Sequence, residues 1–410
     1  MAEVIPFKGI LYNASRVSGE DVIAPPYDII TPELRKTLYA KNPYNVARID
    51  AGEEHDADDE RENKYRRAAD YLDRWQKEGI LIRSGSDSFY AYEMDYESTE
   101  GRKRMSGFFG LVRLEQWGNG IYPHEETHSK PKADRLKLLN ACRAHTSPIF
   151  SLYHSPSRKA SGVVERVRRT YPYLEARDLH GAIHRLWIIE NADDIMTITN
   201  DLAGRAVFIA DGHHRYETAL EFQRMTGKPG GAEPSDFVLM FLANIADGGI
   251  TILPTHRIIR YNTQEILGRL SGCFEMQGFQ ADADITAIMR NRTHVLGLVL
   301  KGDPQQYLLG YSGNNLTKLP SPLQGLDVAV LHERIFKELL NVSDILYEMD
   351  PVIAKRKVRD GEYDAAFFLN PTQVEDVESV ALSSVRMPPK STYFYPKVMT
   401  GFIINSLNTP

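Results

Sequence analysis

The segment 207–220 (VFIADGHHRYETAL) combines an acid, a glycine, two histidines and an arginine within five consecutive positions. An apolar strand is expected to end at Asp211 and Gly212, with a helix beginning directly afterwards. Because the first helical turn presents unpaired N–H groups and a positive dipole end, this junction predicts an anion or phosphate site. Gly212 allows a sharp turn and a close ligand approach. His214 and Arg215 are candidate phosphate ligands, and Arg215 suits bidentate binding.

Asp211 and His213 are the candidate catalytic residues of this segment. At the end of a strand, Asp211 could hold a Mg²⁺ ion or orient a hydroxyl nucleophile, and His213 follows two positions later. The alternative is an ordinary Asp-Gly turn in which Asp211 caps the helix and the histidines bond to the backbone. The residue types leave both interpretations open.

A second polar segment covers 122–139 (YPHEETHSKPKADRLKLL) and supplies Glu125 as a candidate general base. A carboxylate can take the proton of an attacking alcohol when it lies within hydrogen-bond reach. Lys130, Lys132 and Arg135 would neutralise phosphate oxygens. The alternative is a solvated loop followed by a helix that Asp134 caps.

Two further segments carry candidate phosphate ligands. In 387–397 (MPPKSTYFYPK), Lys390 and Lys397 could bind an anion, although three adjacent aromatic residues are more often typical of packing. In 254–260 (PTHRIIR), His256 and Arg257 stand at the end of an expected strand, where a histidine is more often satisfied by its neighbours.

The composition is that of an ordinary globular protein. The chain has 410 residues, of which 42% are hydrophobic and 25% charged, with a net charge of −6. This charge disfavours a broad nucleic-acid or anionic-membrane surface, so we expect neither partner. Because no apolar window reaches the length of a membrane span and no signal peptide is recognisable, we expect a cytoplasmic protein. Two distant cysteines, Cys142 and Cys273, fit a reducing compartment.

The pattern of elements predicts a mixed α/β or α+β fold with a mixed β-sheet flanked by helices. Strands are expected at 88–97 and 104–114 as a hairpin, and at 148–153, 183–190 and 206–210. Strands at 237–245 and 250–258 flank Asp247-Gly248-Gly249, which predicts another hairpin. We expect regions 1–120, 121–262 and 263–410, or else one compact unit.

Several common motifs are missing from the sequence. It contains no GxxxxGK[ST] loop, no GxGxxG after a strand and no GxSxG elbow. Classical nucleotide-binding folds and α/β-hydrolases are therefore disfavoured.

Eight segments, in order, resemble a bacterial and archaeal family known as domain of unknown function ten-fifteen. They are APPYDII, NPYNVARI, HEETHSKPKADRLKLL, SPIFSLY, IADGHHRYETAL, LPTHRIIR, LDVAVLHERIF and MPPKSTYFYPK, and they span nearly the whole chain. The blocks DGHHRYETAL and PPKSTYFYPK are the most specific. The family name implies no reaction.

A more distant resemblance does imply one. Over 183–225, the strand, the DGHHRY block and the helix are similar to the nucleotide-binding signature of the ParB/sulfiredoxin-like superfamily, which includes ADP- or ATP-dependent free serine kinases. The resemblance implies that Gly212, His213, His214 and Arg215 hold nucleotide phosphates, with Asp211 near the transferred group or its metal. Sulfiredoxin chemistry is not expected, because no cysteine is near. Partition function is not expected either, because no helix-turn-helix is recognisable.

Together these features predict a Mg²⁺-assisted phosphotransferase that moves a phosphoryl group from ATP, ADP or another polyphosphate to a small hydroxylated metabolite. Free L-serine is the first candidate acceptor, by the resemblance. The alternatives are a non-catalytic nucleotide-binding sensor and a metal-dependent phosphatase acting on phosphoserine-like substrates. A homodimer is compatible with all three.

Overall fold

The computed structural model describes residues 2–98, 101–125, 129–227, 233–311 and 318–408. The chain forms two compact units. Unit 1 comprises Met1–Tyr122, Thr127–Ile250 and Pro396–Pro410, and unit 2 comprises Pro123–Glu126 and Thr251–Tyr395. This grouping differs from the three consecutive regions expected from the sequence, because the chain enters unit 2 twice and returns to unit 1 each time.

Unit 1 is built on a nine-stranded mixed sheet. The β11–β6 and β12–β8 pairs are parallel, and the other pairs are antiparallel. The prediction of a mixed α/β fold is therefore confirmed, as is the antiparallel pairing of the expected strands at 88–97 and 104–114. In spatial order the strands are β6 (Ile121–Tyr122), β11 (Val207–Asp211), β8 (Ile149–Tyr153), β12 (Phe237–Asn244), β5 (Gly101–Arg113), β4 (Phe89–Ser98), β10 (Ile183–Ile189) and β9 (Leu174–Arg177), with β1 (Val4–Ile5) also on β5.

One face of this sheet is covered by helices α6 (Lys159–Val167), α7 (Ala192–Leu202) and α8 (His213–Thr226). Their buried side chains share one apolar core with alternate residues of the strands. The other face carries an aromatic cluster in which Tyr92 contacts Phe109, Phe241 and Phe402 of the C-terminal segment. The apolar runs in the strand sequences are therefore buried on both faces.

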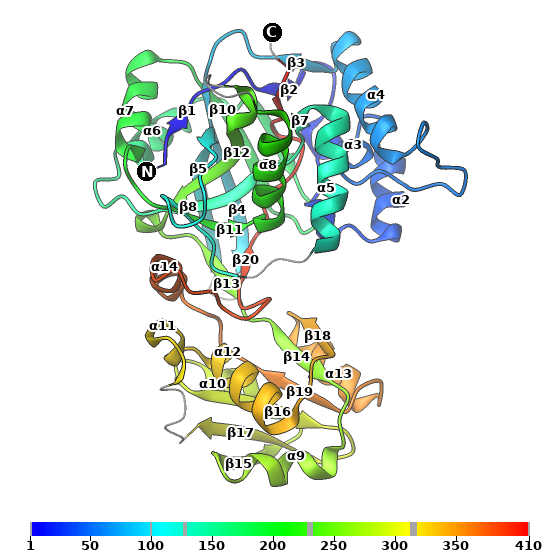
Figure 1. Cartoon of the computed structure of the whole chain (residues 1–410), viewed down its shortest axis with the longest axis vertical. Helices are drawn as coiled ribbons and strands as arrows, with labels where there is room; N and C mark the ends of the chain where they lie inside the picture. Colours follow the sequence, from blue (N-terminus) through cyan, green and yellow to red (C-terminus); the bar gives the residue numbers. More distant parts are fainter. Residues whose placement is uncertain (1, 99–100, 126–128, 228–232, 312–317, 409–410) are drawn as a thin grey trace. The chain divides into compact units, whose positions relative to one another are not determined.

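A second core of unit 1 surrounds Trp75 and lies among short helices and two small strand pairs. Helix α5 (Ser129–Cys142) packs between α4 (Lys64–Lys77) and α8, and Figure 1 shows α5 and α8 side by side. The remaining elements of unit 1 are α1 (Gly19–Val22), η1 (Tyr27–Ile29), α2 (Pro32–Lys41), α3 (Ala47–Asp50), η2 (Pro234–Asp236), η3 (Ile245–Asp247) and the pairs β2 (Ile10–Tyr12) with β3 (Leu81–Arg83) and β7 (Ala144–His145) with β21 (Asn405–Ser406).

Unit 2 contains a six-stranded antiparallel sheet with helices on both faces. Phe368 packs in a core with α10 and α13, whereas the adjacent Phe367 contacts Phe336 of the π-helix η5, so these helices lie on opposite faces. The strands are β15 (Phe274–Gln280), β17 (Gln305–Tyr311), β16 (Val295–Leu300), β19 (Ala365–Phe368), β14 (His256–Ile259) and β18 (Ile345–Glu348), with β13 (Thr251–Leu253) paired to β20 (Tyr393–Tyr395). The helices are α9 (Thr263–Leu270), α10 (Ile285–Met289), α11 (Ser321–Gln324), α12 (Asp327–Ala329), η5 (Val330–Leu340), α13 (Pro351–Arg359) and α14 (Val374–Leu382).

The hairpin expected at Asp247-Gly248-Gly249 was wrong. β12 pairs with β5 and β8, whereas β13 pairs with β20. The two glycines instead stand just before the chain passes from unit 1 into unit 2. Both have positive φ, and a Cβ at Gly249 would lie 1.8 Å from the carbonyl oxygen of Arg104. Glycine is therefore required here by a close backbone approach and not by a hairpin turn.

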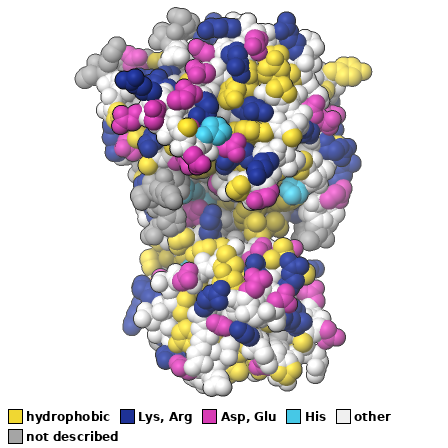
Figure 2. All heavy atoms as spheres, turned by 90° about the vertical axis from the view of Figure 1, so that its right-hand side faces the viewer, with side chains coloured by type: hydrophobic (Ala, Val, Ile, Leu, Met, Phe, Trp, Pro, Cys, Tyr) yellow, Lys and Arg dark blue, Asp and Glu magenta, His cyan; other side chains and the backbone are white. Residues whose placement is uncertain are grey.

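The surface shows no strong segregation of charge on the face in Figure 2, where basic and acidic side chains of the described residues are interspersed. A charged ligand would therefore have to be recognised at a local cluster. Among the described residues, no helix combines the length and apolarity needed to cross a membrane.

Asp201 provides a test of the unit 1 fold, because it ties α7 to the chain between β8 and α6. Its carboxylate accepts hydrogen bonds from Ser155 Oγ, Ser157 Oγ and Ala160 N at 2.8–3.0 Å. Burial opposes ionisation, but these donors hold the pKa of Asp201 below its usual range. We expect Asp201→Asn to lower the free energy of unfolding by about 2–3 kcal/mol at pH 7, measured by urea titration.

The Asp201 contribution should be present above the usual carboxylate pKa and fade in acid, because the folded pKa is the lower one. The control is Asp73→Asn, at an exposed pair with Lys77, which should change little. Equal stability of Asp201→Asn and the unchanged protein would contradict the assignment.

Candidate anion-binding site

The junction of β11 and α8 is built as the sequence predicts. The strand is buried up to Ala210 and ends at Asp211. The register is irregular between Ile209, which pairs with Ser151, and Asp211, which pairs with Phe150, so Ala210 has no partner in the ladder. Helix α8 begins at His213, and Gly212 precedes it with φ +98°. The N-cap residue is Gly212, and the hydrogen bonds of the Asp211 carboxylate come from the side chains of Arg215 and Lys397, so the alternative in which Asp211 caps the helix was wrong.

Gly212 leaves room for the guanidinium of Arg215. A Cβ at position 212 would lie 2.9 Å from Arg215 Nε, and the positive φ is costly for any other residue. Arg215 can therefore fold back over the first turn of its own helix. The glycine matters at this site for two reasons, backbone conformation and the space beside it.

The carboxylate of Asp211 binds two cations. Arg215 donates to Oδ2 at 2.6 Å, and Lys397, from the C-terminal part of unit 1, donates to Oδ1 at 2.5 Å. The side chains are only 11–18% exposed. Burial alone would raise the pKa of Asp211, but Lys397 and Arg215 outweigh it and hold the pKa far below its usual range. We call Asp211, Arg215 and Lys397 the cation cluster; its net charge is positive.

Arg215 also reaches the start of β8, where Nη1 donates to the carbonyl of Pro148. Its Nε is buried and has no hydrogen-bond partner among the described residues. His213 is buried at the start of α8, and its electrostatic interaction with Asp211 also lowers the pKa of that carboxyl group. One strongly polar donor of the cluster thus remains unused within the described structure.

Two cations of α5, Arg135 and Lys132, have partners in the protein. Arg135 donates to Asp134 at 2.9 Å through Nε and to the Asp50 carbonyl at 2.8 Å through Nη1, and it stacks on Tyr27. Lys132 pairs with Glu217 of α8 at 2.9 Å. Lys130 lies in the first turn of α5. The neutralising role expected for these three cations stays a prediction.

The alternative expectation for this segment, a helix capped by Asp134, was wrong. Helix α5 begins at Ser129, so Asp134 lies inside it, where it pairs with Lys64 and Arg135.

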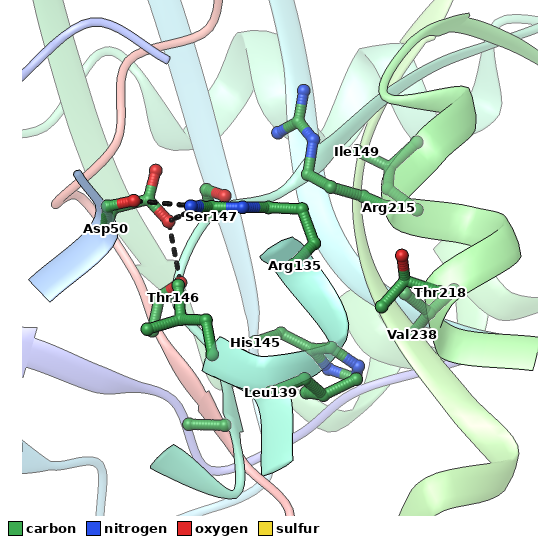
Figure 3. A pocket seen from close by; sticks show the side chains of 12 residues that line it. Asp50, Arg135, Leu139, His145, Thr146, Ser147, Ile149, Arg215, Thr218 and Val238 are labelled. Carbon is green, nitrogen blue, oxygen red and sulfur yellow. Dashed lines mark hydrogen bonds and ion pairs between the residues drawn. The ribbon is translucent and has the colours of Figure 1, made fainter. Parts of the chain in front are cut away.

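A small cavity with both polar and apolar lining residues adjoins Arg215 and Arg135 in unit 1. Its volume is about 40 Å³, which can hold a few water molecules but no nucleotide. Figure 3 shows Arg135 directed at Asp50 and Thr146 beside the same carboxylate, to which it donates at 2.7 Å. Asp50 Oδ2 is buried without a described partner. Arg135, Asp50 and Thr146 thus form a hydrogen-bonded wall beside this cavity.

The sequence did not single out Asp50, Thr146 or Tyr27 as site residues. Asp50 ends the short buried helix that the NPYNVARI segment forms, and Tyr27 belongs to APPYDII. An acid directly after an apolar run was the available signal for Asp50. Tyr27 is half-buried and lies against Arg135; desolvation raises its pKa to about 12, and Arg135 and Arg215 partly offset this shift.

The other predicted site residues, Glu125, His256, Arg257 and Lys390, belong to unit 2. Glu125 forms an isolated bridge with Met387. His256 is fully buried against Phe368, and burial lowers its pKa to about 4, as for a packed neutral histidine. Lys390 is exposed, and its carbonyl accepts from the buried Arg257 at 2.9 Å.

The cation cluster does not fit a Mg²⁺ site. Both oxygens of Asp211 bind cations, and the described part of the chain contains no group of three or more His, Cys, Asp or Glu side chains that could hold a metal. The assignment of Mg²⁺ to Asp211 thus stays a prediction that this geometry does not support.

The shared carboxylate predicts a measurable coupling. Asp211→Asn leaves two poorly hydrated cations together, so we expect a loss of about 3 kcal/mol in the free energy of unfolding at pH 7. Lys397→Met in the same background should restore part of this loss. Urea titration of the four variants of this double-mutant cycle measures the coupling.

The pH dependence follows from the same ion pairs. The folded pKa of Asp211 lies below its usual value of 3.8, so its contribution is present above that pH and is lost as the pH falls. Additive effects of the two substitutions at pH 7 would contradict a shared carboxylate.

No curated protein matches the chain. A free serine kinase in complex with AMP is similar in structure at 13% identity and TM-score 0.39, covering 73% of this chain and 91% of that chain. A conserved hypothetical protein from Pyrococcus furiosus is 14% identical at TM-score 0.37, covering 73% and 95%. SbnI with a C-terminal truncation, from Staphylococcus aureus, is 12% identical at TM-score 0.38, covering 71% and 85%.

The family comparison agrees with the order of motifs in the sequence. The family described as "Protein of unknown function (DUF1015)" matches residues 4–329, which is most of the chain and includes the β11–α8 junction. The MPPKSTYFYPK segment lies beyond the matched range. The chain belongs to the DUF1015 family.

Proposed function

We propose that unit 1 binds the phosphate groups of a nucleotide at the cation cluster and that the protein transfers a phosphoryl group to a small hydroxylated metabolite. The observation that carries this proposal is the pairing of Arg215 and Lys397 on one carboxylate beside the Gly212 turn, with Arg215 Nε unused. Arg135, Lys130 and Lys132 stand on the neighbouring helix as candidate secondary ligands.

The charges of this site are arranged for an anion before any ligand arrives. Arg215 and Lys397 bring two positive charges against one negative charge on Asp211, and the start of the fourteen-residue helix α8 adds a partial positive charge. Because Asp211 fixes both cations, less side-chain ordering remains to be done on binding. Phosphoryl transfer needs mainly such positioning and charge neutralisation.

In the proposed reaction, the acceptor oxygen forms a bond to the transferred phosphorus while the bond to the donor's bridging oxygen breaks. The acceptor proton must pass to a base. Asp211 is a poor base, because two cations hold it ionised and lower its proton affinity. The candidate base predicted from the sequence is Glu125, and the structure does not test this role. Free L-serine is the first acceptor to test, from the resemblance of 183–225 to serine kinases.

The low proton affinity of Asp211 also supports a second function, a nucleotide-binding sensor without turnover. A phosphatase has less support, because the described residues offer no metal cluster. The cytoplasmic location, the homodimer and the absence of nucleic-acid partners stay predictions.

Arg215→Gln tests nucleotide binding. We expect the affinity for ADP and ATP, measured by isothermal titration calorimetry, to fall roughly 10- to 100-fold, since a charge-assisted hydrogen bond contributes about 1.5–3 kcal/mol. The matched control is Arg224→Gln, an exposed position near the other end of α8, which should bind as the unchanged protein does. Unchanged affinity in a folded Arg215→Gln variant would rule out this site.

Phosphorus-31 NMR tests turnover. The purified protein is mixed with L-serine and, separately, ATP, ADP or pyrophosphate, with and without Mg²⁺. We expect a new phosphomonoester signal that requires both serine and one donor. Donor signals that shift without product would favour the sensor. In a separate sample that contains phosphoserine and no nucleotide, release of inorganic phosphate would favour the phosphatase.

A further inference from the structure

A second cavity lies entirely within unit 2. Its volume is about 360 Å³, within the range of roughly 300–1,000 Å³ that small-molecule sites occupy. The π-helix η5 forms one wall, and β18 and the segment 386–389 contribute to the others. Phe336, Ile345 and Met387 supply apolar surface. A π-helix is rare and is frequently found at functional sites.

The charged side chains on the wall leave a positive excess. Glu333 and Lys337 pair with each other at 2.9 Å along η5 and so largely cancel. Arg386 also lines the cavity, and it makes no hydrogen bond or ion pair with the described residues. A cation at a cavity wall without a protein partner calls for a ligand that carries the opposite charge.

A buried guanidinium behind the cavity wall adds a further positive charge. Arg257 is 1% exposed, and the negative charge of Glu125, in the same unit, acts on it and raises its pKa. It donates to His332 Nε2 at 3.3 Å and to the carbonyls of Thr255 and Lys390, and it lies 5.5 Å from the ring centre of Tyr347. Burial lowers its pKa only to about 10, so it is charged at neutral pH.

Arg257 is connected to the cavity through its neighbours, because His332, Tyr347 and Pro389 all line it. Burial and the charge of Arg257 lower the pKa of His332 to about 3. His332 is therefore neutral, and because Nε2 accepts from Arg257, its proton resides on Nδ1 as a further donor. Arg386 and Arg257 thus place two positive charges at or behind the cavity wall. Glu333 is paired with Lys337, and Glu125 is the carboxylate that acts on Arg257.

We propose that this cavity binds a small organic anion, with a carboxylate or phosphate group at Arg386 and an apolar body against Phe336 and Met387. Charge complementarity identifies the anion, and the volume and apolar wall identify the body. Lys390, directly after the cavity-lining prolines, has φ +57°, a backbone conformation that ordinary residues adopt at a cost and that clusters at ligand sites. The inference is independent of the nucleotide site proposed for unit 1.

The test uses two fluorescent probes that share an aromatic body. Anilinonaphthalenesulfonate carries a negative charge, and phenylnaphthylamine is neutral. Both should bind the full-length protein saturably with increased emission. Arg386→Gln should weaken anilinonaphthalenesulfonate about tenfold, the size of one charge-assisted contact, and leave phenylnaphthylamine within about twofold. The matched control is Arg356→Gln, an exposed position on α13 outside the cavity, which should change neither probe.

A second variant tests the location without removing a charge. Ser343 lines the cavity and is exposed, so Ser343→Trp should fold and displace both probes from this site. Competition by benzoate and by phenyl phosphate then distinguishes a carboxylate from a phosphate ligand. The proposal is overturned if Arg386→Gln binds the anionic probe as tightly as the unchanged protein, or if Ser343→Trp retains both probes.

Discussion

The carboxylate of Asp211 is the interaction on which the candidate site of unit 1 depends. It joins the end of β11, the first turn of α8 and the C-terminal segment at one point, through Arg215 and Lys397. A buried carboxylate without partners would take up a proton, and two buried cations without it would repel each other. Arg215 and Lys397 thus keep the buried Asp211 carboxylate ionised, and its charge reduces the repulsion between the two cations.

Local backbone geometry makes this arrangement accessible. Gly212 supplies both a left-handed turn and the space that the Arg215 guanidinium occupies, so strand, turn and helix start are one functional unit. Asp50 and Arg135, which pair with each other, line the small cavity beside Arg215. The inner wall is therefore electrically balanced, while the outer cluster keeps a positive excess that an anion can use.

In unit 2, the buried guanidinium of Arg257 has a different kind of surroundings from that of Arg215. Arg257 is held by backbone carbonyls, a neutral imidazole and an aromatic ring in place of a contacting carboxylate. Such neighbours satisfy N–H donors, and the negative charge of Glu125 acts on Arg257 without a direct ion pair. His332 and Tyr347, which contact Arg257, also line the cavity of unit 2. The two units thus offer two distinct positive sites in a chain whose net charge is negative.

The sequence by itself determined the local parts of this protein. The apolar run before Asp211, the glycine and the helix start gave the β11–α8 junction, because these signals lie within a few residues of one another. The family and the mixed sheet could also be read from ordered motifs and interrupted strand patterns. Only the tertiary structure decided that Lys397 meets Asp211, that Glu125 and Arg257 belong to another unit, and that β13 pairs with β20 and forms no hairpin. These outcomes depend on pairings between residues far apart in the chain, and the free energy of such pairings comes from burial and charge in the folded state, which no local pattern of residues records.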